Sequence, residues 1–293
     1  MTAAMLAGCG GGENTPAEPA AQPLADGGES GVGYRPPPPS SAAQGTAATQ
    51  GIDCAANRPA AASGGRDIAG VTLGMPAEQA FAIVACTNPA FEVDYSSEGG
   101  FRMAKLPGDT QPRTQIAARA GLETMTLSLV GLPGQEQVVA IHRSVEFADG
   151  QEAPVETVLK RLTDKYGQPS YRYSAGDGSV GRYELPYSPD GKLLGPDNAL
   201  FNQCTNDRSD GSMSISDACG ISINFAVHAK SANPGLARSF AVALVDQRAA
   251  MAAIERFNQA AAAMAEKQRQ GELNAAQQAV DAAGKDGNRM PTL

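Results

Sequence analysis

The sequence predicts an α+β fold, in which an antiparallel sheet carries two amphipathic helices packed on one face. Three observations predict this class. Two segments, 76–88 and 154–167, place apolar residues at helical spacing between start and stop signals. Other segments alternate apolar and polar residues, as half-buried strands do. Short turns with Gly or Pro join neighbouring strand segments, as in hairpins, and helices combined with antiparallel hairpins are typical of the α+β class.

Residues 10–65 precede this domain, and their composition predicts a disordered linker. The segment consists mainly of Gly, Ala, Pro, Ser and Gln, and it contains the run "RPPPPS". Such a composition buries too little apolar surface to offset the entropy lost on ordering. A flexible chain of about 50 residues spans on the order of 40 Å. The linker therefore predicts a tether in front of a globular domain, which we assign to residues 66–246.

The two predicted helices share one design. In each, a proline stands near the start (Pro76 and Pro154), and a glutamate two residues later favours the positive end of the helix dipole. Aligned on their prolines, the apolar faces match position by position: Ala80, Phe81 and Val84 in the first helix, and Val158, Leu159 and Leu162 in the second. Two interpretations stay open: a diverged internal repeat, or two independent, well-capped helices.

Strand patterns fill the rest of the domain. Segments 122–130 and 136–147 predict a hairpin around "GLPGQ", and segments 221–229 and 237–246 predict another around "SANPG". Shorter strand signals follow the helices in "FEVDY" and "YRYS", and "GRYELPY" adds a further one. Together these strands predict the antiparallel sheet.

Residues 247–293 predict an Ala-rich helix with a frayed tail beyond Gly271. Its narrow apolar seam consists of Met251, Ile254, Phe257, Ala261 and Met264. Such a seam docks on the domain or meets a second copy or another protein as a short coiled coil.

No stretch of the 293-residue chain reaches the roughly 20 apolar residues that a membrane-spanning helix requires. The chain has 23 Lys and Arg residues against 31 Asp and Glu residues, so it is acidic. We therefore expect no binding to nucleic acid, which requires a basic surface.

The first nine residues end in "LAGC", from Leu6 to Cys9. This motif resembles the lipobox of bacterial lipoproteins, in which Leu, two small residues and Cys form the signal-peptidase II site. The resemblance implies that residues 1–8 are a truncated signal segment and that Cys9 becomes a diacylated N-terminus, carrying chains such as palmitate. A signal peptide also needs a positively charged start and a longer apolar region, so we expect those parts upstream of Met1. Gly10 follows the cysteine where Asp would favour retention in the inner membrane, which implies the outer membrane.

The other four cysteines predict two disulfides. An even number suits a disulfide framework with three possible connectivities, and the pairs nearest in sequence are Cys54–Cys86 and Cys204–Cys219. Export to an oxidising compartment would favour such bonds. A zinc site and free thiols in the cytosol are the alternatives, but no C-x-x-C spacing or neighbouring histidine supports zinc.

No residue pattern predicts catalysis or a cofactor. Both histidines, His142 and His228, lie opposite the apolar residues of their predicted strands. Arg143 lies on an apolar face, which predicts a buried ion pair or, less directly, a ligand anchor. "GDGSVG" lacks the spacing of a hydrolase nucleophile turn.

A weak calcium-loop pattern places Asn206, Asp210 and Asp217 at ligand positions 1, 5 and 12. Position 3, however, is Arg208, where a ligand should stand.

The segments "GVTLGMPAEQA" and "LKRLTDKYGQPS" resemble the "LGM(S/T)xxE" and "KYGxPS" segments of uncharacterised proteobacterial envelope proteins. The arrangement of helix and sheet is also similar to small outer-membrane lipoproteins that assist assembly of barrel proteins. We therefore expect a lipid-anchored, periplasm-facing protein that binds or scaffolds another envelope protein and has no enzymatic activity. The alternatives are an envelope hydrolase with an unrecognised site and a small-ligand or calcium-binding protein.

Overall fold

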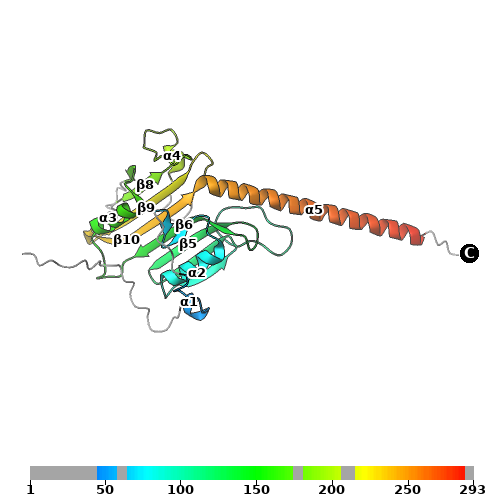
Figure 1. The fold of residues 1–293 in the computed structure, drawn as a ribbon, viewed down its shortest axis with the longest axis horizontal. Helices are drawn as coiled ribbons and strands as arrows, with labels where there is room; N and C mark the ends of the chain where they lie inside the picture. Colours follow the sequence, from blue (N-terminus) through cyan, green and yellow to red (C-terminus); the bar gives the residue numbers. More distant parts are fainter. Residues whose placement is uncertain (1–44, 58–64, 174–180, 206–214, 288–293) are drawn as a thin grey trace, which may run out of the picture. The chain divides into compact units, whose positions relative to one another are not determined.

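An eight-stranded antiparallel sheet forms the core, with strand order β3-β4-β5-β6-β10-β9-β8-β7 (Figure 1). The computed structural model describes residues 45–57, 65–173, 181–205 and 215–287, all of which belong to one unit, Pro39–Leu293. The strands of the sheet are β3 (Glu92–Ser96), β4 (Gln115–Ala120), β5 (Glu123–Val130), β6 (Gln137–Glu146), β7 (Tyr171–Tyr173), β8 (Gly181–Pro186), β9 (Ile221–Lys230) and β10 (Asn233–Asp246). The predicted α+β class with an antiparallel sheet is confirmed.

The first half of the chain contributes the helix α2 (Ala77–Thr87) and the meander from β3 to β6. α2 packs on this half of the sheet, where Phe81 stacks on Tyr95 of β3 with ring centroids 4.7 Å apart. Pro76 occupies the N-cap position rather than the first helical position that the sequence predicted. A two-stranded sheet of β1 (Asp67–Ile68) and β2 (Val71–Thr72) precedes α2.

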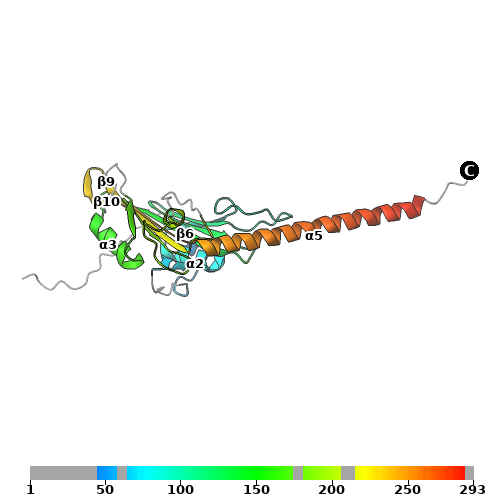
Figure 2. The ribbon, with the colours of Figure 1, turned by 90° about the horizontal axis from the view of Figure 1, so that it is seen from above.

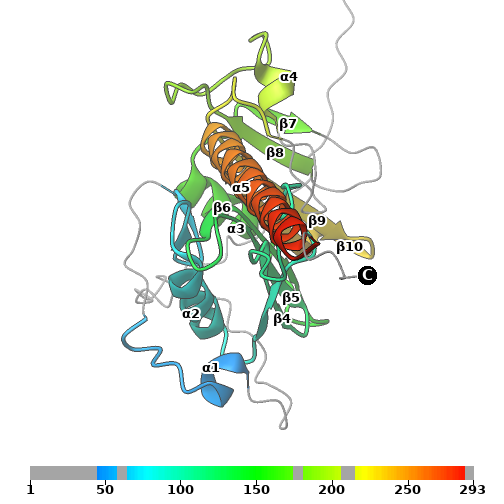
Figure 3. The ribbon, with the colours of Figure 1, turned by 90° about the vertical axis from the view of Figure 1, so that its right-hand side faces the viewer.

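The second half contributes α3 (Val155–Tyr166), the strands β7 to β10 and the short helix α4 (Phe201–Cys204). α3 packs on β9 and β10, and its buried Tyr166 lies 6.5 Å from Phe225 between ring centroids. β6 pairs with β10 at the centre of the sheet, which joins the two halves. Figure 3 shows α4 beside β7 and β8, toward the opposite end of the sheet from α2.

Several elements were missing from the sequence prediction, among them β4 and α4. β4 has the sequence "QIAARA", in which alanines replace the β-branched and aromatic residues that signal a strand. Pairing on both sides, with β3 and β5, compensates for this weak local preference. α4 is a single turn of four residues, which is too short to show any periodicity.

The prediction of a disordered linker was wrong for residues 45–57, which are ordered. They contain α1 (Thr46–Thr49), whose Thr46 and Ala47 are buried. The Thr46 amide donates to the Phe91 carbonyl at 2.8 Å, and the Val93 amide donates to the Thr46 hydroxyl at 2.7 Å. These contacts with a distant segment, together with a disulfide at Cys54, order a sequence whose composition predicts disorder. The predicted linker residues 10–44 and 58–64 lie outside the described residues.

The helix α5 (Gln247–Gly287) follows β10 directly and packs through about its first four turns. Ala250, Phe257 and Ala261 are buried in one cluster with Leu106, Val130 and Val139. Two expectations were wrong here. Met251 and Met264 of the predicted seam are exposed, and the helix does not fray at Gly271 but continues to Gly287 (Figure 2). Alanine-rich composition and pairs such as Arg269–Glu266 favour this continuation.

Every residue from 262 to 284 is exposed. In the part of the chain that the structure describes, no helix is both long and apolar enough to cross a membrane.

Candidate functional site

The four paired cysteines form the two disulfides nearest in sequence. Cys54 bonds to Cys86 and Cys204 bonds to Cys219, with Cα–Cα distances of 5.3 Å and 5.4 Å. The prediction of two disulfides is confirmed. The second bond is fully buried in a small apolar cluster with Leu194 and Phe201. It therefore anchors the lobe between β8 and β9, which otherwise contains little regular structure.

The remaining predicted site residues do not gather into one site. Cys9, Asn206 and Asp210 lie outside the described residues, and Asp217 is exposed. Within the described ranges, no group of three or more His, Cys, Asp or Glu side chains is arranged to hold a metal ion.

Arg143 has the carboxylate partner that its position on an apolar face requires. Its guanidinium lies 2.6 Å from Glu123, which is buried on the neighbouring strand β5. Asn88 donates a second hydrogen bond to Glu123 at 2.9 Å. Arg143 thus joins β6 to β5 and, through Glu123, to the end of α2. His142 is half-buried on β6 and His228 is exposed on β9.

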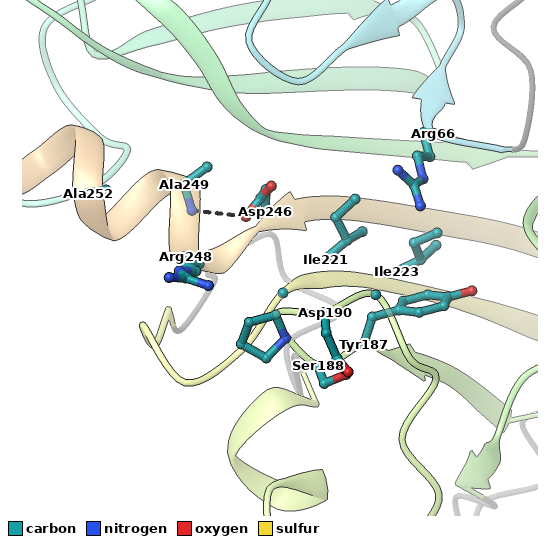
Figure 4. A pocket seen from close by; sticks show the side chains of 13 residues that line it. Arg66, Tyr187, Ser188, Asp190, Ile221, Ile223, Asp246, Arg248, Ala249 and Ala252 are labelled. Atoms are coloured by element: carbon teal, nitrogen blue, oxygen red, sulfur yellow. Dashed lines mark hydrogen bonds between the residues drawn. The ribbon is translucent and has the colours of Figure 1, made fainter.

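A cavity of about 670 Å³ opens where β10 ends and α5 begins. It lies between Arg66, the loop 187–191, the segment 220–223 and the first turns of α5 at 246–252. We call it the arginine cavity. Figure 4 shows Arg66 reaching from one side toward Ile223, while Arg248 projects from α5 on the other side. Its volume lies within the usual range for small-molecule sites, about 300–1,000 Å³.

Gln247 fixes the wall of the cavity that carries Arg248. Its side chain is almost fully buried, at 1% exposure, and forms three hydrogen bonds. The Gln247 amide group donates to the Cys204 carbonyl at 3.0 Å and to the Ser222 hydroxyl at 2.6 Å, and its oxygen accepts from the Ser216 amide at 3.1 Å. The start of α5 is therefore tied to both ends of the lobe that Cys204–Cys219 closes.

Arg248 stands in the first turn of α5, two residues after the capping residue. Asp246 caps the helix, because its carboxylate accepts from the Ala249 amide at 2.9 Å (Figure 4). This turn contains no acidic residue after the cap. A cation at a helix N-terminus is unfavourable by typically 0.3–1 kcal/mol. The Arg248 charge is therefore placed where it does not help the helix.

Arg66 is positioned from the opposite side by close contacts with α3. Gly65 lies so near the Lys165 carbonyl, in a backbone conformation with φ of 67°, that a side chain at this position would collide. Asp67 is buried and pairs with the Lys165 amine at 2.9 Å. Arg66 lies between these two fixed residues, so its backbone is held while its exposed side chain faces the cavity.

The floor of the cavity combines apolar side chains with backbone that is held by hydrogen bonds. It includes Ile221, the buried Ile223 and the ring of Tyr187. Gly220 allows the floor strand to approach the loop, since a side chain there would collide with the Ser188 carbonyl. The Gly220 amide donates to the Tyr187 carbonyl, and the Tyr187 amide donates to the Ile221 carbonyl, both at 2.8 Å.

The charged side chains of the cavity differ in their partners. Among the described residues, neither Arg66 nor Arg248 forms an ion pair. Two carboxylates also line the cavity, but each is bound by its own segment. Asp246 caps α5, and Asp190 accepts from the Ser188 hydroxyl, which lowers the pKa of Asp190. The guanidinium donors are therefore available to an anion.

A second, smaller cavity of about 400 Å³ lies at the start of α2, and its charges are paired. Arg113 forms a two-bond pair with Glu136 at 2.8 Å and 3.1 Å and lies over the ring of Tyr95. Burial raises the pKa of Tyr95. Burial acts in the same direction on Glu136, but hydrogen bonds from the Arg113 side chain and backbone outweigh it and lower the pKa of Glu136. This cluster has the properties of a structural ion pair.

No sequence pattern predicted the arginine cavity. Arg66 and Arg248 stand far apart in the chain, and neither belongs to a motif. One local signal was present: a basic residue directly after the first helical position of α5, where an acidic one is expected.

Comparisons with known proteins assign no family to this chain. No family model matches it, and neither a curated protein nor a solved structure is significantly similar. The function therefore has to be argued from the residues and geometry described above.

Proposed function

We propose that this protein is a lipid-anchored, periplasm-facing protein of the bacterial envelope, and that its α+β domain binds another envelope component. The arginine cavity is the observation that supports a binding role. Its two guanidiniums have no described ionic partner, and its two carboxylates are hydrogen-bonded within their own segments. Neither histidine of the chain lines it. This arrangement favours recognition of a ligand over hydrolysis, which would need a base free to take a proton.

The envelope location rests on Cys9 and on the two disulfides. Bonds such as Cys54–Cys86 and Cys204–Cys219 persist in oxidising compartments, including the periplasm. "LAGC" supplies the attachment point in our proposal, and the Gly- and Pro-rich residues that follow supply the tether. Two acyl chains on one residue give stable membrane attachment, whereas a single chain binds only marginally.

Fractionation of the native bacterium tests the anchor. The wild-type protein should sediment with membranes and incorporate labelled palmitate, and Cys9→Ser should move to the soluble fraction without label. A variant with both Cys54→Ser and Cys86→Ser is the matched control, because it also removes thiols but should keep the anchor. A Cys9→Ser protein that remains in the membrane fraction would contradict the proposal.

We infer further that the two halves of the domain descend from one duplicated unit. Each half consists of a helix followed by four antiparallel strands, and the strand order is mirrored about the central pair of β6 and β10. The strand registers place Tyr95, which contacts α2, and Phe225, which contacts α3, on the same face of the sheet. An experimental structure whose halves superpose with equivalent strand pairing would support the duplication. Halves with different pairing would contradict it.

A further inference from the structure

We propose that the arginine cavity binds a phosphate ester with an apolar body, and that Arg66 and Arg248 hold the phosphate group. The inference builds on the proposed binding role and names its ligand class. It does not depend on the lipid anchor, because the cavity lies wholly within the described domain. Its first support is that both guanidiniums line one cavity without an ionic partner among the described residues.

The hydrogen-bond donors of the two arginines suit a phosphate monoester, while Asp190 and Asp246 keep their negative charges within their own segments of the lining. A phosphate monoester carries about −1.5 to −2 charges at pH 7 and offers three acceptor oxygens. The guanidinium is a planar fork of donors that binds phosphate through two parallel hydrogen bonds. A single carboxylate would neutralise only one of the two guanidiniums. The three acceptor oxygens of a phosphate can engage two such forks, whereas a monocarboxylate offers two, so the donors favour a phosphate.

The floor of the cavity predicts the remainder of the ligand. Ile221 and the Tyr187 ring present apolar surface beside the arginines. A wholly polar anion would leave this surface exposed to water, whereas an alkyl or aromatic group would bury it at about 25 cal/mol per Å². A phosphate joined to an apolar body satisfies both parts of the cavity at once.

The position of Arg248 argues for a role other than stability. In the first turn of α5, its charge opposes the helix dipole, and the described structure gives it no compensating ion pair. Neutralising Arg248 should therefore weaken ligand binding without lowering the stability of the domain. Neutralising a residue that merely supports the fold would weaken ligand binding and lower stability together.

Isothermal titration calorimetry on the full chain carrying Cys9→Ser tests the proposal in solution. The probe is decyl phosphate below its aggregation concentration, and decanoate and decyl maltoside are the carboxylate and neutral comparisons. We expect one site for decyl phosphate. Arg66→Gln and Arg248→Gln should each weaken binding by about tenfold or more, as expected for the loss of a charge-assisted pair. Arg256→Gln is the matched control, since Arg256 is an exposed arginine of α5 outside the cavity.

Binding measurements with lipid vesicles identify the source of the phosphate. Binding to phosphatidic acid vesicles but not to phosphatidylcholine vesicles, lost in Arg248→Gln, would indicate a lipid phosphate. Binding of monomeric decyl phosphate without vesicle binding would indicate a free phosphate ester. Equal affinity for decyl phosphate and decyl maltoside, or equal losses in Arg256→Gln and Arg248→Gln, would overturn the proposal. Either result would leave the membrane-fractionation test of Cys9 unaffected.

Thermal unfolding of the same variants separates binding from folding. Arg248→Gln should unfold at the wild-type temperature or slightly above it, because the unfavourable charge in the first turn is gone. If Arg248→Gln instead unfolds well below the wild type, the arginine has a structural role and the argument from its position is wrong.

Discussion

At the scale of single residues, the domain places its buried charges in pairs that join neighbouring elements. Glu123 lies on β5, is 3% exposed and accepts from both Arg143 and Asn88. Glu136 is similarly buried and is bound by Arg113. Removing one partner of such a pair leaves an uncompensated charge, whereas replacing both with apolar residues can be nearly neutral.

The Arg143–Glu123 pair gives a prediction for a double-mutant cycle. Arg143→Met should lower the free energy of unfolding by about 3 kcal/mol, because Glu123 then stays buried without its cation. Combining Arg143→Met with Glu123→Leu should recover much of that loss. Urea denaturation measures both values, and Arg119→Met, an exposed arginine on neighbouring β4, should change little. If the double variant loses the sum of the single effects, the two residues do not act as a pair.

The lowered pKa of Glu136 predicts a dependence of stability on acid. Its carboxylate stabilises the fold fully above the ordinary pKa of 4.5, and this contribution is lost as the pH falls through the lowered pKa in the folded state. The difference in unfolding free energy between wild type and Glu136→Gln should therefore be largest near neutral pH and shrink in acid. Urea titrations at a series of pH values measure it, with exposed Glu92→Gln as control. A difference that stays constant or widens in acid would contradict this account.

At the scale of elements, the packed start of α5 and its exposed remainder should differ in their importance for stability. Phe257 is 3% exposed in the cluster with Leu106 and Val139, so Phe257→Ala should cost about 3–5 kcal/mol. A chain that ends at Gln270 should unfold within about 0.5 kcal/mol of the full chain, because the lost residues whose burial is described, 271–284, are all exposed. Urea denaturation compares the two. Equal losses would mean that the exposed helix packs on the domain in solution.

The two disulfides should differ in their effect on the cavity. Replacing either pair by alanines should lower stability by roughly 3–4 kcal/mol in the chain-entropy model. Only the Cys204/Cys219 variant should also weaken decyl phosphate binding, since Gln247 ties the start of α5 to the Cys204 carbonyl. The Cys54/Cys86 variant is the matched control at the far end of the domain. Equal effects of both variants on binding would show that the lobe does not position Arg248.

Local sequence signals predicted the regular elements well and the tertiary features poorly. α2 and α3 have prolines at their starts and periodic apolar faces, and β5, β6, β9 and β10 alternate, so each could be predicted within a few residues. β4 and α1 depend on contacts with segments distant in sequence, which no local pattern encodes. The pairing of β6 with β10 and the placement of Arg66 and Arg248 on one cavity also arise only when distant segments come together.

At the scale of the whole molecule, the proposals describe a domain attached to a membrane through Cys9 and a tether. In this proposal residues 10–44 form the tether, and a flexible chain of about 35 residues would let the domain reach ligands on the order of 30 Å from its anchor. The arginine cavity would then take a phosphate ester from the envelope. In this proposal the described domain supplies the cavity, and its two disulfides stabilise the domain.

The most direct test is phosphorus-31 NMR of the extract from protein purified out of its native envelope. We predict a phosphate-ester signal approaching one equivalent per chain, which falls to background when Arg66→Gln and Arg248→Gln are combined. Arg256→Gln should retain the signal. Wild-type protein that carries no more phosphorus than the double variant would contradict the account.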